Sequence, residues 1–152
     1  MDEQTTNAQP SETQAQSAAP VGQLKTNRGL LKLILLSIVT LGIYALVFFC
    51  GVTSDINVIA SRYDGKKTMH FALLIFVLTP ITGGIAYFVW MHRLSNRIGG
   101  ELSRRGIDFK LSAADFWIWD VLLSVIIVGP FIFLHKFCAS MNKLSEHYNV
   151  NG

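Results

Sequence analysis

Asp120 is the residue best placed to do chemistry, because it is the only carboxylate inside a long apolar stretch. An ionisable side chain at membrane depth is costly to bury, so it is a functional candidate, here for a proton or ion relay. Asp120 also lies next to Trp119 and close to the start of its stretch. We therefore favour an interfacial position, where water or an arginine solvates the carboxylate.

Histidines and cysteines are the other side chains that could bind a metal or act as nucleophiles. The four histidines are scattered, no pair has zinc-ligand spacing, and the HExxH and CxxC patterns are absent from the sequence. Cys50 and Cys138 are interpreted as small apolar thiols, with a disulfide or acylation of a membrane-edge cysteine as alternatives. We expect no enzyme activity, no metal and no cofactor.

Small residues beside a threonine and a tyrosine form a candidate helix-packing motif. Its members are Thr40, Gly42, Tyr44, Gly83 and Gly84. Small side chains let membrane helices approach closely, either within one chain or between subunits. The segment 40–43 (TLGI) can also be laid on 82–85 (TGGI), which indicates an internal repeat of about 42 residues unless the similarity is chance.

Three apolar stretches must position these residues, at about 30–50, 71–91 and 116–134. At 1.5 Å per residue, each is about 28–32 Å long as a helix, which matches a hydrocarbon core of roughly 30 Å. Charged residues make up 15% of the chain, whereas soluble domains carry roughly 25%. We predict an all-α polytopic membrane protein with three transmembrane helices. The low charge argues against an ordinary cytosolic enzyme, a disordered regulator and a nucleic-acid-binding domain.

The segments outside these stretches complete the predicted organisation. Residues 1–27 are read as a disordered tail, 28–148 as the helical membrane domain and 149–152 as the C-terminal end. Each apolar stretch is followed by an amphipathic basic extension, which we expect to lie at the membrane interface among anionic head groups. The pattern from Ser112 to Asp115 fits a capping box and predicts a helix start near Ala113.

Two membrane topologies fit this pattern. Three spans place the N-terminus and the second connector on the side richer in Lys and Arg, which predicts a cytoplasmic N-terminus. Alternatively, the helix breakers inside the stretches turn each one back as a re-entrant hairpin. These breakers are Gly42, Pro80 with 83–84, and 129–130. All basic connectors then lie on one side, but each turn must find partners for its backbone groups.

The stretch 35–57, with TLGIY at 40–44 and Asp55-x-Asn57, resembles a bacterial membrane-protein family catalogued as domain of unknown function 4234. The resemblance continues through Arg105-Gly106 and 111–112 to 141–144 (MNKL), so it covers about 28–148. It departs at Phe48-Phe49, where a tryptophan is common, and at 79–84. The resemblance implies a multi-pass membrane protein and brings no activity, cofactor or binding residue with it.

We therefore expect a non-enzymatic accessory or interaction protein of the bacterial inner membrane. Its expected partners are the lipid bilayer, anionic lipid head groups at the basic connectors, and a second copy or another membrane protein, but no nucleic acid. The alternative is a subunit of a small oligomeric transporter or channel. Polar residues around a water-filled cavity would favour transport, whereas a small-residue seam facing lipid would favour a partner protein.

Overall fold

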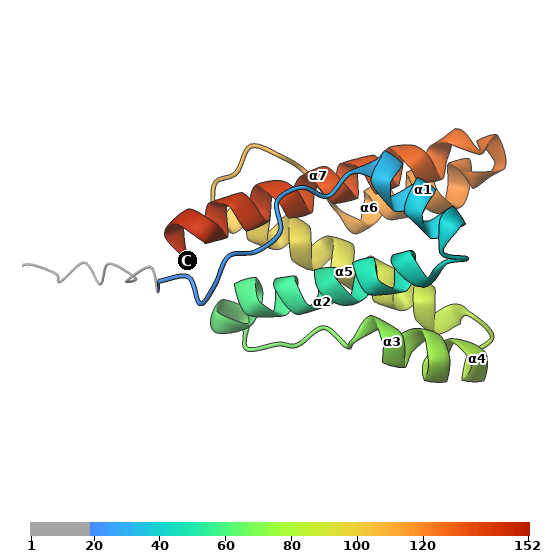
Figure 1. Ribbon diagram of the computed structural model, residues 1–152, viewed down its shortest axis with the longest axis horizontal. Coiled ribbons are helices and arrows are strands. Elements are labelled where there is room, and N and C mark those ends of the chain that lie inside the picture. The colour runs from blue at the N-terminus through green and yellow to red at the C-terminus, as the bar shows by residue number, and fades with distance from the viewer. Residues whose placement is uncertain (1–18) are drawn as a thin grey trace, which may run out of the picture.

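The computed structural model describes residues 19–152, and this part of the chain is all-helical, with extended connectors and no strand. The helices form three hairpins, each made of a short first arm, a turn and a long second helix (Figure 1). Hairpin 1 consists of α1 (Leu30–Val39) and α2 (Ile43–Asp64). Hairpin 2 consists of α3 (Phe71–Leu73), the π-helical η1 (Leu74–Leu78), α4 (Thr79–Ile81) and α5 (Ile85–Arg104). Hairpin 3 consists of α6 (Ala113–Asp115), the π-helical η2 (Phe116–Val121), the 3-10 helix η3 (Leu122–Ile126) and α7 (Val128–Asn151).

The three continuous helices predicted over 30–50, 71–91 and 116–134 are wrong, because each stretch turns back near its middle. The turns lie at 40–42, 82–84 and Ile127, so the helix-breaking alternative describes the local structure. All three turns meet at one end of the molecule, on the right in Figure 1. Within the described residues, α2 is the one helix with the length and apolar composition needed to cross a membrane.

The predicted repeat of about 42 residues is also present in the structure, as equivalent turns in hairpins 1 and 2. Gly42 and Gly84 occupy equivalent positions before the second helix and have φ values of 90° and 95°. The preceding residues, Leu41 and Gly83, also correspond, with φ values of 51° and 61°. These left-handed conformations reverse the chain within three residues, and glycine adopts them without steric cost. Gly42, Gly83 and Gly84 are therefore turn residues, whereas the other predicted breakers, Pro80 and 129–130, lie within α4 and α7.

The core lies between the second helices, which pack together along the half of the molecule away from the turns (Figure 1). Their apolar stripes are fully buried in this core; they include Ile56 and Ile59 of α2, Leu94, Ile98 and Leu102 of α5, and Phe137, Met141 and Leu144 of α7. The sequence analysis placed these stripes against the membrane interface. They pack against one another instead, because three amphipathic helices can satisfy their apolar faces mutually.

Three extended segments, which we call straps, connect the hairpins in a ring. Strap 1 (19–29) lies along α7, strap 2 (65–70) along α2, and strap 3 (107–112) along α5. Each strap precedes the first arm of its own hairpin and is held by the second helix of another hairpin. Thus α7 of hairpin 3 binds the strap of hairpin 1, and α2 of hairpin 1 binds the strap of hairpin 2. In the same way, α5 of hairpin 2 binds the strap of hairpin 3.

Asparagine side chains make the strap contacts. Asn142 donates to the carbonyl of Arg28 at 2.7 Å and accepts from its amide at 2.9 Å. Asn149 bonds Leu24 in the same paired way, at 2.9 and 2.7 Å. Each amide thereby satisfies both backbone groups of an extended residue. Residues 19–27 are consequently bound to α7 and are not part of a disordered tail, whereas residues 1–18 of that predicted tail lie outside the described residues.

The predicted helix start near Ala113 is confirmed at the end of strap 3. The Ser112 hydroxyl accepts a hydrogen bond from the Asp115 amide, and the Asp115 carboxylate accepts one from the Ser112 amide at 2.9 Å. This capping box satisfies free donors at the start of the helix. The amide of Ala113 donates to Asn96 on α5 at 2.9 Å, which ties the cap to hairpin 2.

The adjacent glycines of α5 test the strap 3 contact directly. A Cβ on Gly99 would lie 1.8 Å from the carbonyl oxygen of Leu111, whereas a Cβ on Gly100 would meet nothing within 4 Å. We expect Gly99→Ala to lower the free energy of unfolding by about 1–3 kcal/mol, because backbone must move. Gly100→Ala should raise it by about 0.5–1 kcal/mol, because alanine favours the helix. Denaturant unfolding in mild detergent measures both, and equal effects would contradict the strap packing.

Candidate functional site

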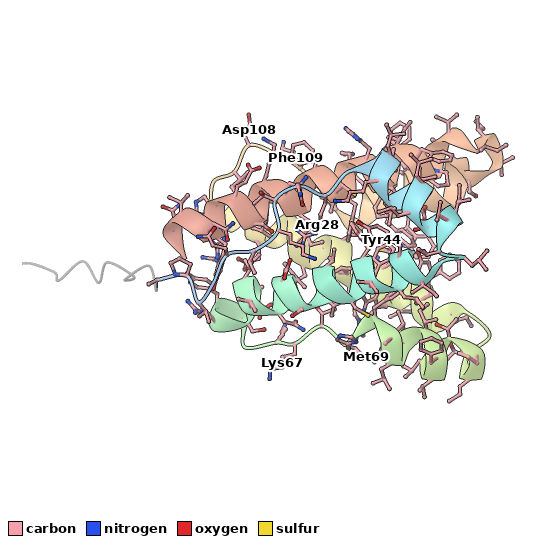
Figure 2. All side chains as sticks on the ribbon, in the orientation of Figure 1. Arg28, Tyr44, Lys67, Met69, Asp108 and Phe109 are labelled. Carbon is pink, nitrogen blue, oxygen red and sulfur yellow. The ribbon has the colours of Figure 1, made fainter. Side chains whose placement is uncertain are left out.

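The turn end of the molecule exposes large apolar side chains on all three hairpins. Apart from Val21, Tyr63 and Val150, every exposed large apolar residue of the described chain lies within 31–47, 73–89 or 117–131. These ranges contain only two charged residues, Lys32 and Asp120. We call this surface the apolar end. Its carbon-rich side chains project outward around the turns in Figure 2. A contiguous apolar surface of this kind marks an interaction with a membrane or a protein.

Threonine side chains satisfy the backbone of two turns. The Thr40 hydroxyl donates to the carbonyl of Leu36 at 2.6 Å and accepts from the amide of Tyr44 at 2.9 Å. Thr82, 42 residues later, makes the same pair of bonds to the carbonyl of Leu78 and the amide of Ala86. Each hydroxyl therefore closes the end of one arm and caps the start of the next helix.

Leu41 places an exposed apolar side chain at the first turn, in a backbone conformation that is strained for a residue other than glycine. It is 94% exposed, and its φ of 51° is a conformation that costs a non-glycine residue roughly 1–2 kcal/mol. The equivalent residue of hairpin 2 is Gly83, which adopts the conformation freely. In hairpin 3 the most exposed apolar residue, Val125 at 88%, also lies beside the turn.

The opposite half of the molecule contains ion pairs that join the hairpins, and we call this region the ion-pair layer. Arg28 of strap 1 forms a salt bridge with Asp55 of α2, and only 6% of the Arg28 side chain is exposed. Figure 2 shows Arg28 on the strap beside α2, away from the turns. Arg97 of α5 pairs with Asp64 of α2 at 2.8 Å. These charged groups are committed to partners on neighbouring elements, so they hold the hairpins together.

Three more ion pairs belong to this layer. Lys136 of α7 pairs with Asp115, which joins the two arms of hairpin 3. Burial alone would raise the pKa of Asp115, but hydrogen bonds from Lys136 and Ser112 hold that pKa below its usual range. Glu101 of α5 pairs with Arg104 at 2.6 Å and with Arg105 at 3.4 Å.

Aromatic rings lie between the apolar end and the ion-pair layer. Phe49 contacts Phe71 and Phe137, with ring centroids 4.9 and 5.9 Å apart, so the rings join all three hairpins. Trp90 packs on Phe71 and donates its indole N–H to the carbonyl of Met69 at 2.9 Å. Rings with one apolar and one polar side are typical of the boundary between lipid and water.

The residues predicted from the sequence are distributed over the apolar end. Gly42, Gly83 and Gly84 lie in turns, and a Cβ on any of them would meet no atom of the described chain within 4 Å. They therefore do not serve helix packing within this chain, and packing between subunits stays a prediction. Tyr44 lies in the first turn of α2, close to the bend, in Figure 2. Asp120 is half-buried on η2 and has no arginine partner among the described residues.

The strap asparagines are the structural residues that the sequence analysis missed. Asn142 and Asn149 are seven residues apart on α7, so they occupy the same helix face two turns apart. Asn57 holds strap 2 in the same way, through paired bonds to Thr68 at 2.9 and 2.7 Å. Asparagine is a poor helix former, so its recurrence inside these helices was the available signal. The cysteines are free, and the described residues hold no metal-binding group.

His147 makes the stability of the C-terminal end of α7 depend on pH. Burial lowers the pKa of His147, as do the nearby charges of Arg105 and Arg104, and its ring contacts Arg105 at 3.1 Å. A lowered pKa means that the folded state favours the neutral ring. The contribution of His147 to the free energy of unfolding is therefore complete above about pH 6.5 and is lost as the pH falls through the pKa of the folded state. We expect hydrogen-exchange protection of residues 147–152 to fall from pH 7.5 to pH 5. His147→Asn should remove this loss, while His135→Asn, an exposed control, should retain it.

The fold and surface together define a helical-hairpin protein with an exposed apolar end and a layer of ion pairs at the other end. A comparison with protein-family models matches residues 28–100 to Domain of unknown function (DUF4234). This match confirms the resemblance to that family across hairpin 1 and most of hairpin 2; it does not extend to 101–148. Neither the curated proteins nor the solved structures provide a match.

Proposed function

We propose that this chain is a membrane-attached accessory protein that inserts its three hairpins into one leaflet. The observation that carries the proposal is the gathering of exposed apolar side chains at all three turns, on the same end of the molecule. A solvated surface of that composition would be costly, whereas hydrocarbon accommodates it.

The lengths of the first arms support insertion to half the depth of a bilayer. α1 has 10 residues, and the first arm of hairpin 2 covers 71–81. At 1.5 Å per residue these arms are about 15–16 Å long, close to half of a hydrocarbon core of roughly 30 Å. Such arms fit one leaflet.

The hydrogen bonds of the turns answer the objection that turns at membrane depth lack backbone partners. The hydroxyls of Thr40 and Thr82 each bond a carbonyl and an amide at the turn. The amides of Gly42 and Gly84 also bond carbonyls of the preceding arm, at 2.7 and 2.9 Å. Internal satisfaction of this kind is what lipid requires of a backbone.

Insertion from one face also explains the charge distribution. The straps, the connectors and the C-terminal end all lie at the end opposite the turns, together with nearly all Lys and Arg residues. Since positive residues are retained in the cytoplasm, we propose that this end faces the cytoplasm of a bacterial inner membrane. Its exposed cations then contact anionic head groups.

Cysteine accessibility distinguishes one-leaflet insertion from three spans. With Cys50 and Cys138 replaced by serine, Lys67→Cys places a thiol on strap 2. One-sided insertion predicts that a membrane-impermeant maleimide labels this thiol only after the cells are permeabilised. Three spans with a cytoplasmic N-terminus predict labelling in intact cells, and that result would overturn the hairpin topology. Lys110→Cys on strap 3 is cytoplasmic in both topologies and serves as the matched control.

A non-enzymatic role is supported by the use of the ionisable side chains. Arg28, Arg97 and Lys136 are each committed to a carboxylate on another element, so they act in assembly of the fold. A transporter or channel subunit is the second candidate, and Asp120 favours it, because its half-buried carboxylate has no salt bridge in the described chain. Chemical cross-linking in vesicles separates the two: a closed ring of copies supports transport, and a single copy bound to another protein supports the accessory role.

A further inference from the structure

We propose that hairpin 2 binds one anionic phospholipid in a groove beside α5, an inference that rests on the proposed membrane insertion. The groove has a volume of about 1170 Å³ and is open on one side. Its wall from the first arm includes Leu74 and Leu78, and its wall from α5 includes Ile85 and Val89. The groove continues past the apolar end to strap 2.

The α5 wall changes from apolar to basic along its length. Ile85, Val89 and Arg93 are four residues apart and therefore share one face of the helix. The rise from Ile85 to Arg93 is about 12 Å at 1.5 Å per residue. The apolar part begins at the turn, and Arg93 lies toward the ion-pair layer. An acyl chain lying along Ile85 and Val89 would thus place its head group beside Arg93.

The basic part of the groove contains cations that form no salt bridge in the described chain. Lys66 and Lys67 of strap 2 line it with Arg93, and none of these three side chains forms an ion pair within residues 19–152. The acidic residues nearby are already neutralised, because Asp64 pairs with Arg97, and Glu101 pairs with arginines 104 and 105. The groove therefore presents uncompensated positive charge where a lipid phosphate would lie.

The other hairpins differ at the corresponding place. In hairpin 3 the arms touch, since a Cβ on Gly129 would lie 2.1 Å from the carbonyl oxygen of Trp119. In hairpin 2 the groove lies between the arms, and its lining includes the buried side chains of Leu74 and Trp90. The groove leaves room for a chain molecule, and the gradient from apolar to basic selects one with an anionic head.

Photo-labelling in vesicles tests the groove. Phosphatidylglycerol and phosphatidylcholine, each with a diazirine in the acyl chain, are compared at equal concentration, and the labelled residues are mapped by mass spectrometry. We expect phosphatidylglycerol to label 74–89 at least several-fold more than phosphatidylcholine does. Equal labelling by the two lipids, equal labelling of all three turns, or cross-linking of the groove to a second copy would each overturn the proposal.

Matched charge variants identify the head-group site. The triple variant Lys66→Gln, Lys67→Gln and Arg93→Gln should abolish the preference for phosphatidylglycerol. The control triple variant Lys32→Gln, Lys110→Gln and Lys143→Gln changes the net charge equally and should keep the preference. If the control also loses it, the groove site is wrong.

Flotation with vesicles separates failure of the groove from failure of insertion. Both triple variants should still float with vesicles, because the apolar end is intact in each. Flotation without preferential groove labelling overturns the lipid site alone, whereas loss of flotation by the unmodified protein overturns insertion and the site together. As a second test, Val89→Trp should reduce the one-to-one phosphatidylglycerol adduct in native mass spectrometry, while Ile38→Trp, an exposed apolar control on α1, should not.

Discussion

The double variant Leu41→Asp, Val125→Asp is expected to detach the chain from membranes. The two residues are 94% and 88% exposed beside the turns of hairpins 1 and 3. A carboxylate at bilayer depth costs about 2.5–3.5 kcal/mol, and the removed apolar side chain contributes a further 1.5–3 kcal/mol or so. Vesicle flotation should therefore show more than a hundredfold loss of membrane binding.

The control for this result is the pair Val21→Asp, Val150→Asp. These valines are 75% and 79% exposed, but they lie at the opposite end of the molecule. They change charge and hydrophobicity comparably, so they should leave flotation within about twofold of the unmodified protein. Circular dichroism in detergent should show native helicity for both pairs, because none of the four side chains is buried. Equal loss of binding by the two pairs would argue against insertion through the turns.

Asp55→Asn is expected to give the largest loss of stability. It leaves the Arg28 guanidinium, 6% exposed, without its carboxylate. Breaking one partner of a buried ion pair costs about 3–5 kcal/mol. Arg28 retains bonds to the carbonyl of Lys25 at 2.6 Å and the hydroxyl of Ser145 at 3.2 Å, which place the expected loss at the lower end of that range. Denaturant unfolding in detergent measures this loss, and trypsin cleavage after Lys25 reports release of strap 1.

Two further variants show whether the pair itself is responsible. Asp55→Asn combined with Arg28→Gln removes the unpaired charge and should recover much of the loss, because the two sites interact directly. Asp108→Asn removes an exposed carboxylate on strap 3 and should change the free energy of unfolding by less than about 0.5 kcal/mol. A double variant as unstable as the sum of its single variants would contradict the proposed coupling.

Some of the candidate site could be predicted from the sequence. The apolar stretches, the family and the capping box at Ser112 follow from composition, motif and local hydrogen-bonding chemistry. The repeat was visible as the similarity of 40–43 and 82–85, and the structure shows that the shared residues form equivalent turns. The cations of the proposed lipid groove were recognised as basic connectors, but their position beside Ile85 and Val89 was not predictable.

The strap contacts show why the remainder was not predictable. Asn142 and Arg28 are 114 residues apart, and nothing local in either segment indicates that they meet. The stripe of Phe137, Met141 and Leu144 posed the same difficulty, since an amphipathic helix can turn its apolar face to lipid or to another helix. Burial against α2 and α5 decided between these partners.

By itself, the sequence determined that the described chain is helical, where its apolar stretches lie and where its basic segments lie. Only the tertiary structure decided that Gly42 and 82–84 reverse the chain. A glycine or proline inside an apolar stretch is compatible with a kinked span and with a turn, because both satisfy the local backbone. The choice depends on whether the second half of each stretch finds a packing partner. Here α2, α5 and α7 pack against one another, and the buried core between them stabilises the folded-back form of each hairpin.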